Sequence, residues 1–319
     1  MSIFPTKILL ATDNSVEATL AAKVAAKIVD KIDSNLYIVY VRPRIVPHYP
    51  GFYVGPEVVQ NAQQKEQKML DREAQGLLDI QVKEVRAAGG SVAQTHLRVG
   101  RPDEEIVALS EELGADLVVI GARGWGGIRR ILMGSVSESV VTHVHCSVLV
   151  VRGDENGESV FPSRKRILLA SDGSEEAELA LQMAVNLANS TSSELHVVTV
   201  GMSNLPEYVE LLEETYRRLE REGQQTLDEQ VKKIEEAGGN VTKAHLTMEG
   251  GPGQEIIALA EEIGAGLIVV GSRGYGRLRR ALIGSVSELV VQHAHCPVLV
   301  VRKEKHYDGI GHEAQNTPT

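Results

Sequence analysis

The stretch that decides the fold is Leu117-Val-Val-Ile-Gly-Ala-Arg-Gly124, followed after nine further residues by Gly134-Ser135. The arrangement returns as Leu267-Ile-Val-Val-Gly-Ser-Arg-Gly274 and Gly284-Ser285. In each copy an apolar strand leads into a glycine loop and then into the start of a helix. Glycines let backbone N–H groups approach an anion, and a helix N-terminus adds partial positive charge. The pattern therefore predicts two phosphate-binding loops.

These loops belong to a longer internal repeat. Residues 121–152 and 271–302 align without a gap and are identical at 22 of 32 positions. Asp13 and Asp172 occupy matching places near the front of each copy. We expect one domain at 1–152 and a second at 164–303, joined by a linker at 153–163 and followed by a polar tail at 304–319.

Short apolar runs alternate with helix-like segments in both copies. The expected strands are 8–11, 36–41, 92–97, 117–120 and 148–151, then 167–170, 195–200, 241–246, 267–270 and 298–301. This alternation predicts an α/β fold with a parallel sheet between helices. Such sheets bind ligands at the carboxyl ends of the strands where the strand order reverses. We expect the first strand beside the fourth, with Asp13 facing the Gly121 loop.

The composition narrows the class of protein. The chain has 319 residues, 43% of them hydrophobic but only 4% aromatic, so two aliphatic cores are expected. The net charge of −10 supplies no basic field for nucleic acid or an anionic membrane. Scarce aromatic residues also disfavour a protein that stacks bases.

The cysteine content and the N-terminal sequence favour a reducing compartment. Cys146 and Cys296 stand at equivalent places, and one thiol per domain is a poor disulfide framework. No signal-peptide pattern follows Met1, and no apolar run is long enough for a transmembrane helix. We expect a cytoplasmic protein with no membrane partner.

The glycine loops carry the candidate phosphate contacts. Gly121 and Gly124 are interpreted as allowing close contact with a ribose and the first phosphate. Gly134, Ser135 and Ser137 are interpreted as the helix-end site for the terminal phosphates, and Ser135 can also cap the helix. The alternative is a tight turn and a capped helix without a ligand.

Charged residues near the loops are open to two interpretations. Arg123 and Arg273 can neutralise phosphates, whereas the spacer pairs Arg129-Arg130 and Arg279-Arg280 fit a solvated loop equally well. The aspartates that follow the first strands, Asp13 and Asp172, can cap a helix or accept a hydrogen bond from adenine or ribose.

Other side chains are candidates for an apolar pocket wall and for a metal site. Ala11, Val41, Ala170 and Val200 can line an apolar slot for a base, or simply belong to the core. His143, His145 and Cys146, like their counterparts at 293–296, resemble metal ligands. Consecutive ligands at one helix end rarely converge on a tetrahedral ion, so a buried structural thiol is favoured. No catalytic base is evident, which favours binding over turnover.

Together these residues resemble the universal stress protein family over nearly all of 5–152 and 164–302. The resemblance rests on Gly-x-x-Gly, nine residues and Gly-Ser, a signature of the family's ATP-binding branch. Asp13, Asp172 and the endings Cys146-Ser-Val-Leu-Val-Val151 and Cys296-Pro-Val-Leu-Val-Val301 match as well. The chain is similar to the tandem form, with two such domains.

The resemblance implies two flavodoxin-like domains of the adenine nucleotide alpha hydrolase type, each a five-stranded parallel sheet in the order 3-2-1-4-5. It implies bound ATP, Mg²⁺ on the phosphates, and pairing of the two halves through strand five, and it leaves a further homodimer open. The implied nucleotide-binding residues are Ala11, Asp13, Val41, Gly121, Arg123, Gly124, Gly134, Ser135, Val136 and Ser137, then Ala170, Asp172, Val200, Gly271, Arg273, Gly274, Gly284, Ser285, Val286 and Ser287.

Three functions fit these observations. The first is an ATP-binding stress-response sensor or regulator with little or no hydrolysis. The second is a slow ATPase or nucleotidyl-transfer enzyme, which would need electrostatic help from a metal and Arg123. The third is a nucleotide-free assembly module that associates through its strand edges.

Overall fold

The computed structural model describes residues 5–31, 34–44, 56–124, 133–153, 161, 163–201, 213–248, 250–274 and 283–303. The first half contains β1 (Lys7–Thr12), α1 (Val16–Lys31), β2 (Asn35–Arg42), α2 (Pro56–Ala87), β3 (Gln94–Val99), α3 (Pro102–Leu113), β4 (Leu117–Gly121), α4 (Ser135–His143) and β5 (Ser147–Val151). The second half contains β6 (Arg166–Ala170), α5 (Glu175–Thr191), β7 (Glu194–Val200), α6 (Glu213–Glu236), β8 (Val241–Thr247), α7 (Pro252–Glu262), β9 (Leu267–Gly271), α8 (Ser285–His293) and β10 (Val298–Val301).

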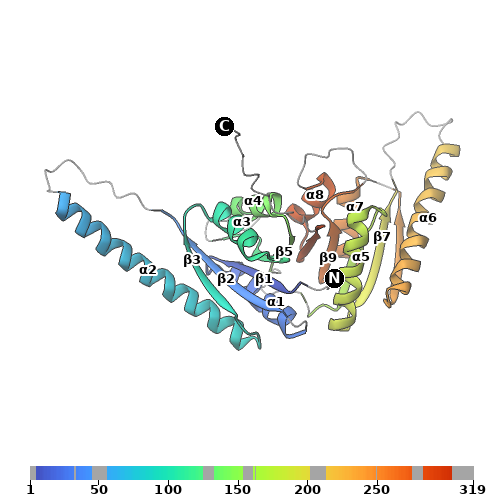
Figure 1. Ribbon diagram of the computed structural model, residues 1–319. Coiled ribbons are helices and arrows are strands. Elements are labelled where there is room, and N and C mark those ends of the chain that lie inside the picture. The colour runs from blue at the N-terminus through green and yellow to red at the C-terminus, as the bar shows by residue number, and fades with distance from the viewer. Residues whose placement is uncertain are drawn as a thin grey trace, which may run out of the picture.

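The strands of each half form a parallel sheet, which confirms the predicted α/β class. The order is β3-β2-β1-β4-β5 in the first half and β8-β7-β6-β9-β10 in the second (Figure 1). β1 pairs with β4 from Ile8↔Leu117 to Ala11↔Ile120, so the predicted neighbourhood of the first and fourth strands is confirmed. The strand order therefore reverses at the carboxyl ends of β1 and β4, where ligands of such sheets bind.

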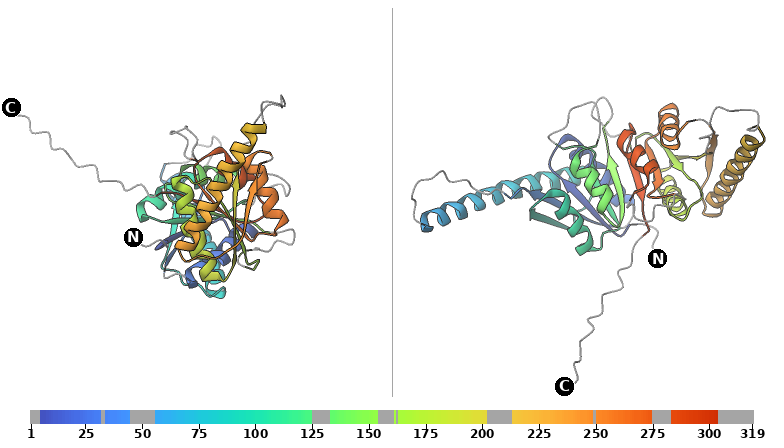
Figure 2. Two further views of the ribbon diagram at one scale, coloured as in Figure 1. Left: turned by 90° about the vertical axis from the view of Figure 1, so that its right-hand side faces the viewer. Right: turned by 90° about the horizontal axis from the view of Figure 1, so that it is seen from above.

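The two sheets join into one sheet of ten strands. β5 and β10 pair antiparallel, with Leu149 opposite Leu299. Figure 2, seen from above, shows the two halves meeting along these strands. Strand five of each half therefore has a strand on both sides: β5 lies between β4 and β10, and β10 between β9 and β5.

Two aliphatic cores cover the two faces of the sheet. One core packs α1, α2, α5 and α6 against the sheet through residues such as Leu10, Leu78 and Leu169. The other packs α3, α4, α7 and α8 through residues such as Val118 and Val290. β4 and β9 are buried along their whole length, as expected for central strands covered on both faces. No helix in the described ranges is long and apolar enough to cross a membrane.

One predicted strand is displaced. β3 runs over Gln94–Val99 instead of 92–97, and its residues are half-buried or exposed. An edge strand with one open side lacks the continuous apolar run that marks the central strands, so its start is poorly defined by the sequence. Residues 154–160 and 162 of the linker, the tail from 304, and residues 45–55 between β2 and α2 lie outside the described residues. The predicted domain bounds stay a prediction.

Two arginines cross between the halves at the β5–β10 seam. Arg152, just after β5, donates to the carbonyl oxygens of Val291 and Gln292 at the end of α8, the latter at 3.0 Å. Arg302, just after β10, donates to carbonyl oxygens at the end of α4. Burial lowers the pKa of each guanidinium to about 10, so both remain charged at neutral pH. Each half thus supplies a cation to the negative end of a helix in the other half.

Two histidines on neighbouring strands, His196 on β7 and His245 on β8, face each other. Nδ1 of His196 and Nε2 of His245 are 3.3 Å apart, and the rings are stacked with 21° between their planes. Glu194 lies 3.8 Å from Nε2 of His196. Burial lowers the pKa of both rings below the ordinary value of 6.5, and Lys243 adds to the effect at both.

These lowered pKa values predict that the protein loses stability in mild acid. The unfolded chain binds protons more readily than the folded histidines do, so the stabilising contribution is present above pH 6.5 and is lost as the pH falls through the folded pKa. We expect Tm to fall by a few degrees between pH 7 and pH 5. His196→Tyr copies Tyr37 of the first half and should reduce the fall. An equal fall of Tm with pH in the parent and the variant would show that the histidine pair does not cause the loss of stability.

Candidate functional site

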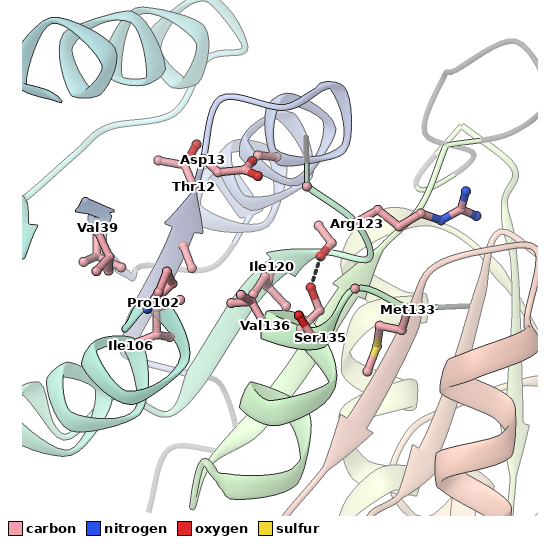
Figure 3. Close-up of a pocket in the computed structure, with 17 residues that line it drawn as sticks. Thr12, Asp13, Val39, Pro102, Ile106, Ile120, Arg123, Met133, Ser135 and Val136 are labelled. Carbon is pink, nitrogen blue, oxygen red and sulfur yellow. Dashed lines mark hydrogen bonds between the residues drawn. The ribbon is translucent and has the colours of Figure 1, made fainter. Parts of the chain in front are cut away.

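A cavity of about 490 Å³ lies where the carboxyl ends of β1, β2 and β4 meet the starts of α3 and α4 (Figure 3). Its volume falls within the usual range for small-molecule sites. All ten residues that the sequence predicts for the first half line it. The remaining lining residues are Thr12, Ala18, Val39, Pro102, Ile106, Ile120 and Met133.

The wall of the cavity beside β1 and β2 is apolar. Ala11, Val39, Ile106 and Ile120 are buried, and Val41 is partly buried against the same core. Val39 and Val41 share one face of β2, because side chains two residues apart point to the same side of a strand. This wall gives an uncharged planar group a surface to pack on, as the slot prediction requires.

The turn after β1 holds Asp13 at the rim of the cavity. Asn14 adopts a left-handed conformation with φ 61°, which Asn tolerates better than most residues. Oδ1 of Asp13 accepts a hydrogen bond from the Ser15 amide at 2.9 Å. Oγ of Ser15 in turn accepts from the Ala18 amide at 3.2 Å, so Ser15 and not Asp13 caps α1. The capping interpretation of Asp13 is therefore wrong, because its carboxylate closes the turn before the helix.

Gly121 and Gly124 are small because protein atoms fill the space beside them. A Cβ on Gly121 would lie 2.8 Å from the Glu17 carbonyl carbon in the first turn of α1. A Cβ on Gly124 would overlap with Oδ2 of Asp13. Packing against α1 and Asp13 therefore explains these glycines without a ligand, although both residues line the cavity.

Gly134 is different, because its missing side chain leaves room. A Cβ there would meet only ordinary contacts, the nearest being the Ala122 carbonyl oxygen at 3.5 Å. Gly134 is the N-cap of α4, with φ −67° and ψ 149°, and as a glycine it offers no side chain to cap the helix. The prediction that Ser135 caps the helix is therefore wrong, because Ser135 is the first helical residue.

The amides at the start of α4 form the polar wall of the cavity. The Gly134 amide donates to Ala122, and the first amide bonded within the helix is that of Glu138, which donates to Gly134. The amides of Ser135, Val136 and Ser137 precede it and, by helix geometry, have no partner within α4. Three donors at a positive helix end form a site for an anion. The Ser137 hydroxyl is buried and donates to the Gly121 carbonyl oxygen at 2.8 Å, which ties α4 to β4.

Arg123 lines the cavity, but its charged end is directed elsewhere. Figure 3 shows its guanidinium pointing away from the cavity residues. Nε of Arg123 lies 3.9 Å from Oε1 of Glu17. Burial raises the pKa of Glu17, and Arg123 counters part of that shift. The side chain is directed to this half-buried carboxylate on α1, so phosphate contact would require it to turn.

The second half repeats this geometry in detail. A Cβ added to Gly274 would overlap with Oδ2 of Asp172. A Cβ added to Gly271 would lie 2.9 Å from the Glu176 carbonyl carbon. Gly284 is the N-cap of α8 with ordinary contacts only, and the Ser287 hydroxyl donates to Gly271 at 2.6 Å. The other matched residues lie at equivalent places. Ala170 ends β6, Val200 ends β7, Arg273 follows β9, and Ser285 and Val286 begin α8.

Several lining residues are missing from the sequence prediction. Val39 could have been found from the alternation along β2, since it shares a face with Val41. Pro102 and Ile106 come from the start of α3, which reaches the cavity only through tertiary packing. The spacer arginines Arg129-Arg130 and Arg279-Arg280 lie outside the described residues.

The described residues give no clustered set of three His, Cys, Asp or Glu for a metal. Nε2 of His145 lies 3.2 Å from Oε1 of Glu111, and burial raises the pKa of the Cys146 thiol to about 12. These side chains belong to the packing beneath α4. A cation at the cavity would have to be held largely by the ligand, with the Asp13 carboxylate at the cavity wall.

Comparison with known proteins identifies relatives of both halves. The model of the universal stress protein family matches residues 5–152 and 163–302. A universal stress protein of Mycolicibacterium smegmatis is 30% identical over 300 residues, covering 92% of this chain and 96% of that protein. One from Methanocaldococcus jannaschii is 40% identical over 157 residues, covering 47% of this chain and 87% of that protein.

Solved structures are similar over both halves as well. The crystal structure of a universal stress protein from Archaeoglobus fulgidus aligns with a TM-score of 0.60 and 25% identity, covering 93% of this chain and 96% of that chain. A second, from Pseudomonas aeruginosa, aligns with a TM-score of 0.64 at 19% identity over 94% of each chain, which speaks for the fold alone.

Proposed function

Because the chain belongs to the universal stress protein family through both of its halves, we propose that it is an ATP-binding regulator with one nucleotide site in each half. The observation that carries the proposal is the start of α4. Three helix amides without partners in α4 stand at one end of a cavity of about 490 Å³, beside a glycine whose missing side chain leaves room. An apolar wall stands opposite, so the cavity offers one end to phosphates and the other to a base.

In this proposal the phosphates bind the amides of Ser135, Val136 and Ser137, and the base packs between Val39, Val41 and Ile106. Asp13 accepts a hydrogen bond from the base or the ribose. Mg²⁺ neutralises the phosphates, since the one described arginine of the loop is directed to Glu17. In the second half the amides at the start of α8 bind the phosphates, and Asp172 accepts the hydrogen bond from the base or the ribose.

The seam supports pairing of the two halves within one chain through strand five. Strand five of each half is already paired on both sides, so these edges are closed to further chains. This counts against strand five as the edge through which a nucleotide-free module would assemble, and a further homodimer would need another surface. The cytoplasmic location stays a prediction.

Calorimetric titration of the full chain with MgATP tests the proposal. We expect saturable binding with micromolar dissociation constants, on the order of −8 kcal/mol, and one nucleotide for each half. Phosphate release over hours should stay near the uncatalysed rate. The regulator proposal fails if no heat of binding is found at millimolar nucleotide. Rapid turnover that is lost on Ser135→Ala with Ser285→Ala would instead favour the ATPase.

A further inference from the structure

Two buried glutamines stand on helices that are otherwise rich in charge. Gln81 on α2 is 0% exposed and Gln230 on α6 is 2% exposed. Figure 1 shows α2 and α6 at opposite ends of the molecule. Burying an amide costs free energy unless it is hydrogen-bonded, so a repeated buried glutamine calls for a physical reason.

Each glutamine binds the hydroxyl at the end of the first strand of its half. Thr12 Oγ1 donates to Oε1 of Gln81 at 2.6 Å, and Ser171 Oγ donates to Oε1 of Gln230 at 2.9 Å. A hydroxyl has one proton, and here the amide oxygen takes it. The lone pairs of the hydroxyl are thereby left to accept a hydrogen bond from elsewhere.

That second hydrogen bond comes from the turn that carries the aspartate. The Asn14 amide donates to Thr12 Oγ1 at 3.1 Å, and the Gly173 amide donates to Ser171 Oγ at 3.3 Å. Both donors are left-handed, with φ 61° and 83°. The hydroxyl therefore holds the left-handed residue of the turn, Asn14 or Gly173. Asp13 or Asp172 lies between the hydroxyl residue and this left-handed residue, so its position is held as well.

The aspartate passes this constraint to the cavity. Oδ1 of Asp13 accepts from the Ser15 amide, and its Oδ2 lies against Gly124 of the glycine loop. Asp172 makes the same two contacts, with the Ser174 amide at 3.0 Å and with Gly274. A continuous set of contacts thus leads from the long helix to the rim of each candidate site.

Packing alone does not account for the amide. Nε2 of Gln81 is buried and has no hydrogen-bond partner among the described residues. A methionine would fill a similar volume without burying an amide N–H₂ group. The amide is therefore a poor choice for stability, and its oxygen is the part that the geometry uses.

We propose that Gln81 and Gln230 are positioning residues for the two nucleotide sites. Each orients a hydroxyl, at Thr12 or Ser171, so that the turn after the first strand holds its aspartate at the cavity. The inference rests on the proposed binding of ATP at these sites. Neither glutamine touches the ligand, and both act through the hydroxyl and the turn.

The test replaces both partners of one bond, in Thr12→Val with Gln81→Met. We expect Tm to change little, because the joint removal of two buried polar groups offsets the loss of the acceptor for the Asn14 amide. The affinity of the first site for MgATP should fall about tenfold, while that of the second site stays unchanged. Without nucleotide, hydrogen exchange of the peptide amides at 13–16 should become about tenfold faster. Thr12→Ser, which copies Ser171 and keeps the hydroxyl, should keep the parent rate of exchange at 13–16.

The matched control is Gln75→Met, on the same helix. Gln75 is exposed and donates a hydrogen bond to Asp79 on the same helix at 3.0 Å, so its loss should change neither affinity nor exchange. Parent-like affinity and exchange in the Thr12→Val, Gln81→Met chain would overturn the inference. If the parent binds no ATP, the proposed function falls, and the exchange at 13–16 still decides whether Gln81 fixes the turn.

Discussion

Replacing Gly134 by valine is expected to remove ATP binding from the first half and leave the second half intact. The φ and ψ of Gly134 lie in the extended region that valine adopts readily, and an added Cβ makes only ordinary contacts. The fold should therefore tolerate the change. The two methyl groups would fill the space in front of the Ser135 and Val136 amides, where the phosphates are proposed to bind. Loss of these charge-assisted bonds should weaken binding by about a hundredfold or more.

Calorimetry and melting together check this result. The binding stoichiometry should fall from two to one in Gly134→Val and likewise in Gly284→Val, with no binding in the double variant. Gly76→Val is the control, since Gly76 faces open space on α2 and should leave both sites intact. Full stoichiometry in Gly134→Val, at an unchanged Tm, would place the nucleotide elsewhere or nowhere.

The same substitution at the other loop glycines would test packing and not ligand binding. Gly121 lies against the backbone of α1, and Gly124 lies against Asp13. A motif of identical letters thus contains two kinds of glycine. The sequence marks all of them as small, but only the neighbours in space show which one leaves room for a ligand.

Much of the fold could be predicted from the sequence because it depends on local patterns. Buried central strands such as β4 read as continuous apolar runs, and glycines punctuate them. The repeat supplied each element twice. The start of β3 was missed because an edge strand with polar residues has no such run.

The site was predictable where it follows a motif and not where it depends on packing. Gly134, Ser135 and Asp13 were found because strand ends and helix starts meet at the reversal of strand order. Ile106 was missed because α3 reaches the cavity only by tertiary packing. The direction of Arg123 was missed because it is set by Glu17, a helix residue whose placement no local pattern fixes.

The seam arginines are the second place where a large effect is expected. Arg302→Met should lower the free energy of unfolding by about 3 kcal/mol, because buried carbonyl oxygens at Val141 and Val144 lose their donor and each orphaned group costs about 1–3 kcal/mol. The end of α4 also loses a cation that favours its dipole. Arg152→Met should act likewise on α8.

Arg166→Met separates this effect from the general loss of an arginine. Arg166 also donates to a carbonyl oxygen at a helix end, that of Ile263 at 2.7 Å, and it pairs with Glu194, but it is exposed and serves one half only. Its loss should cost less than about 1 kcal/mol in urea unfolding. If Arg302→Met costs no more than Arg166→Met, the crossing arginines do not hold the halves together. If it also splits one unfolding transition into two, the seam is what makes the two halves unfold as one.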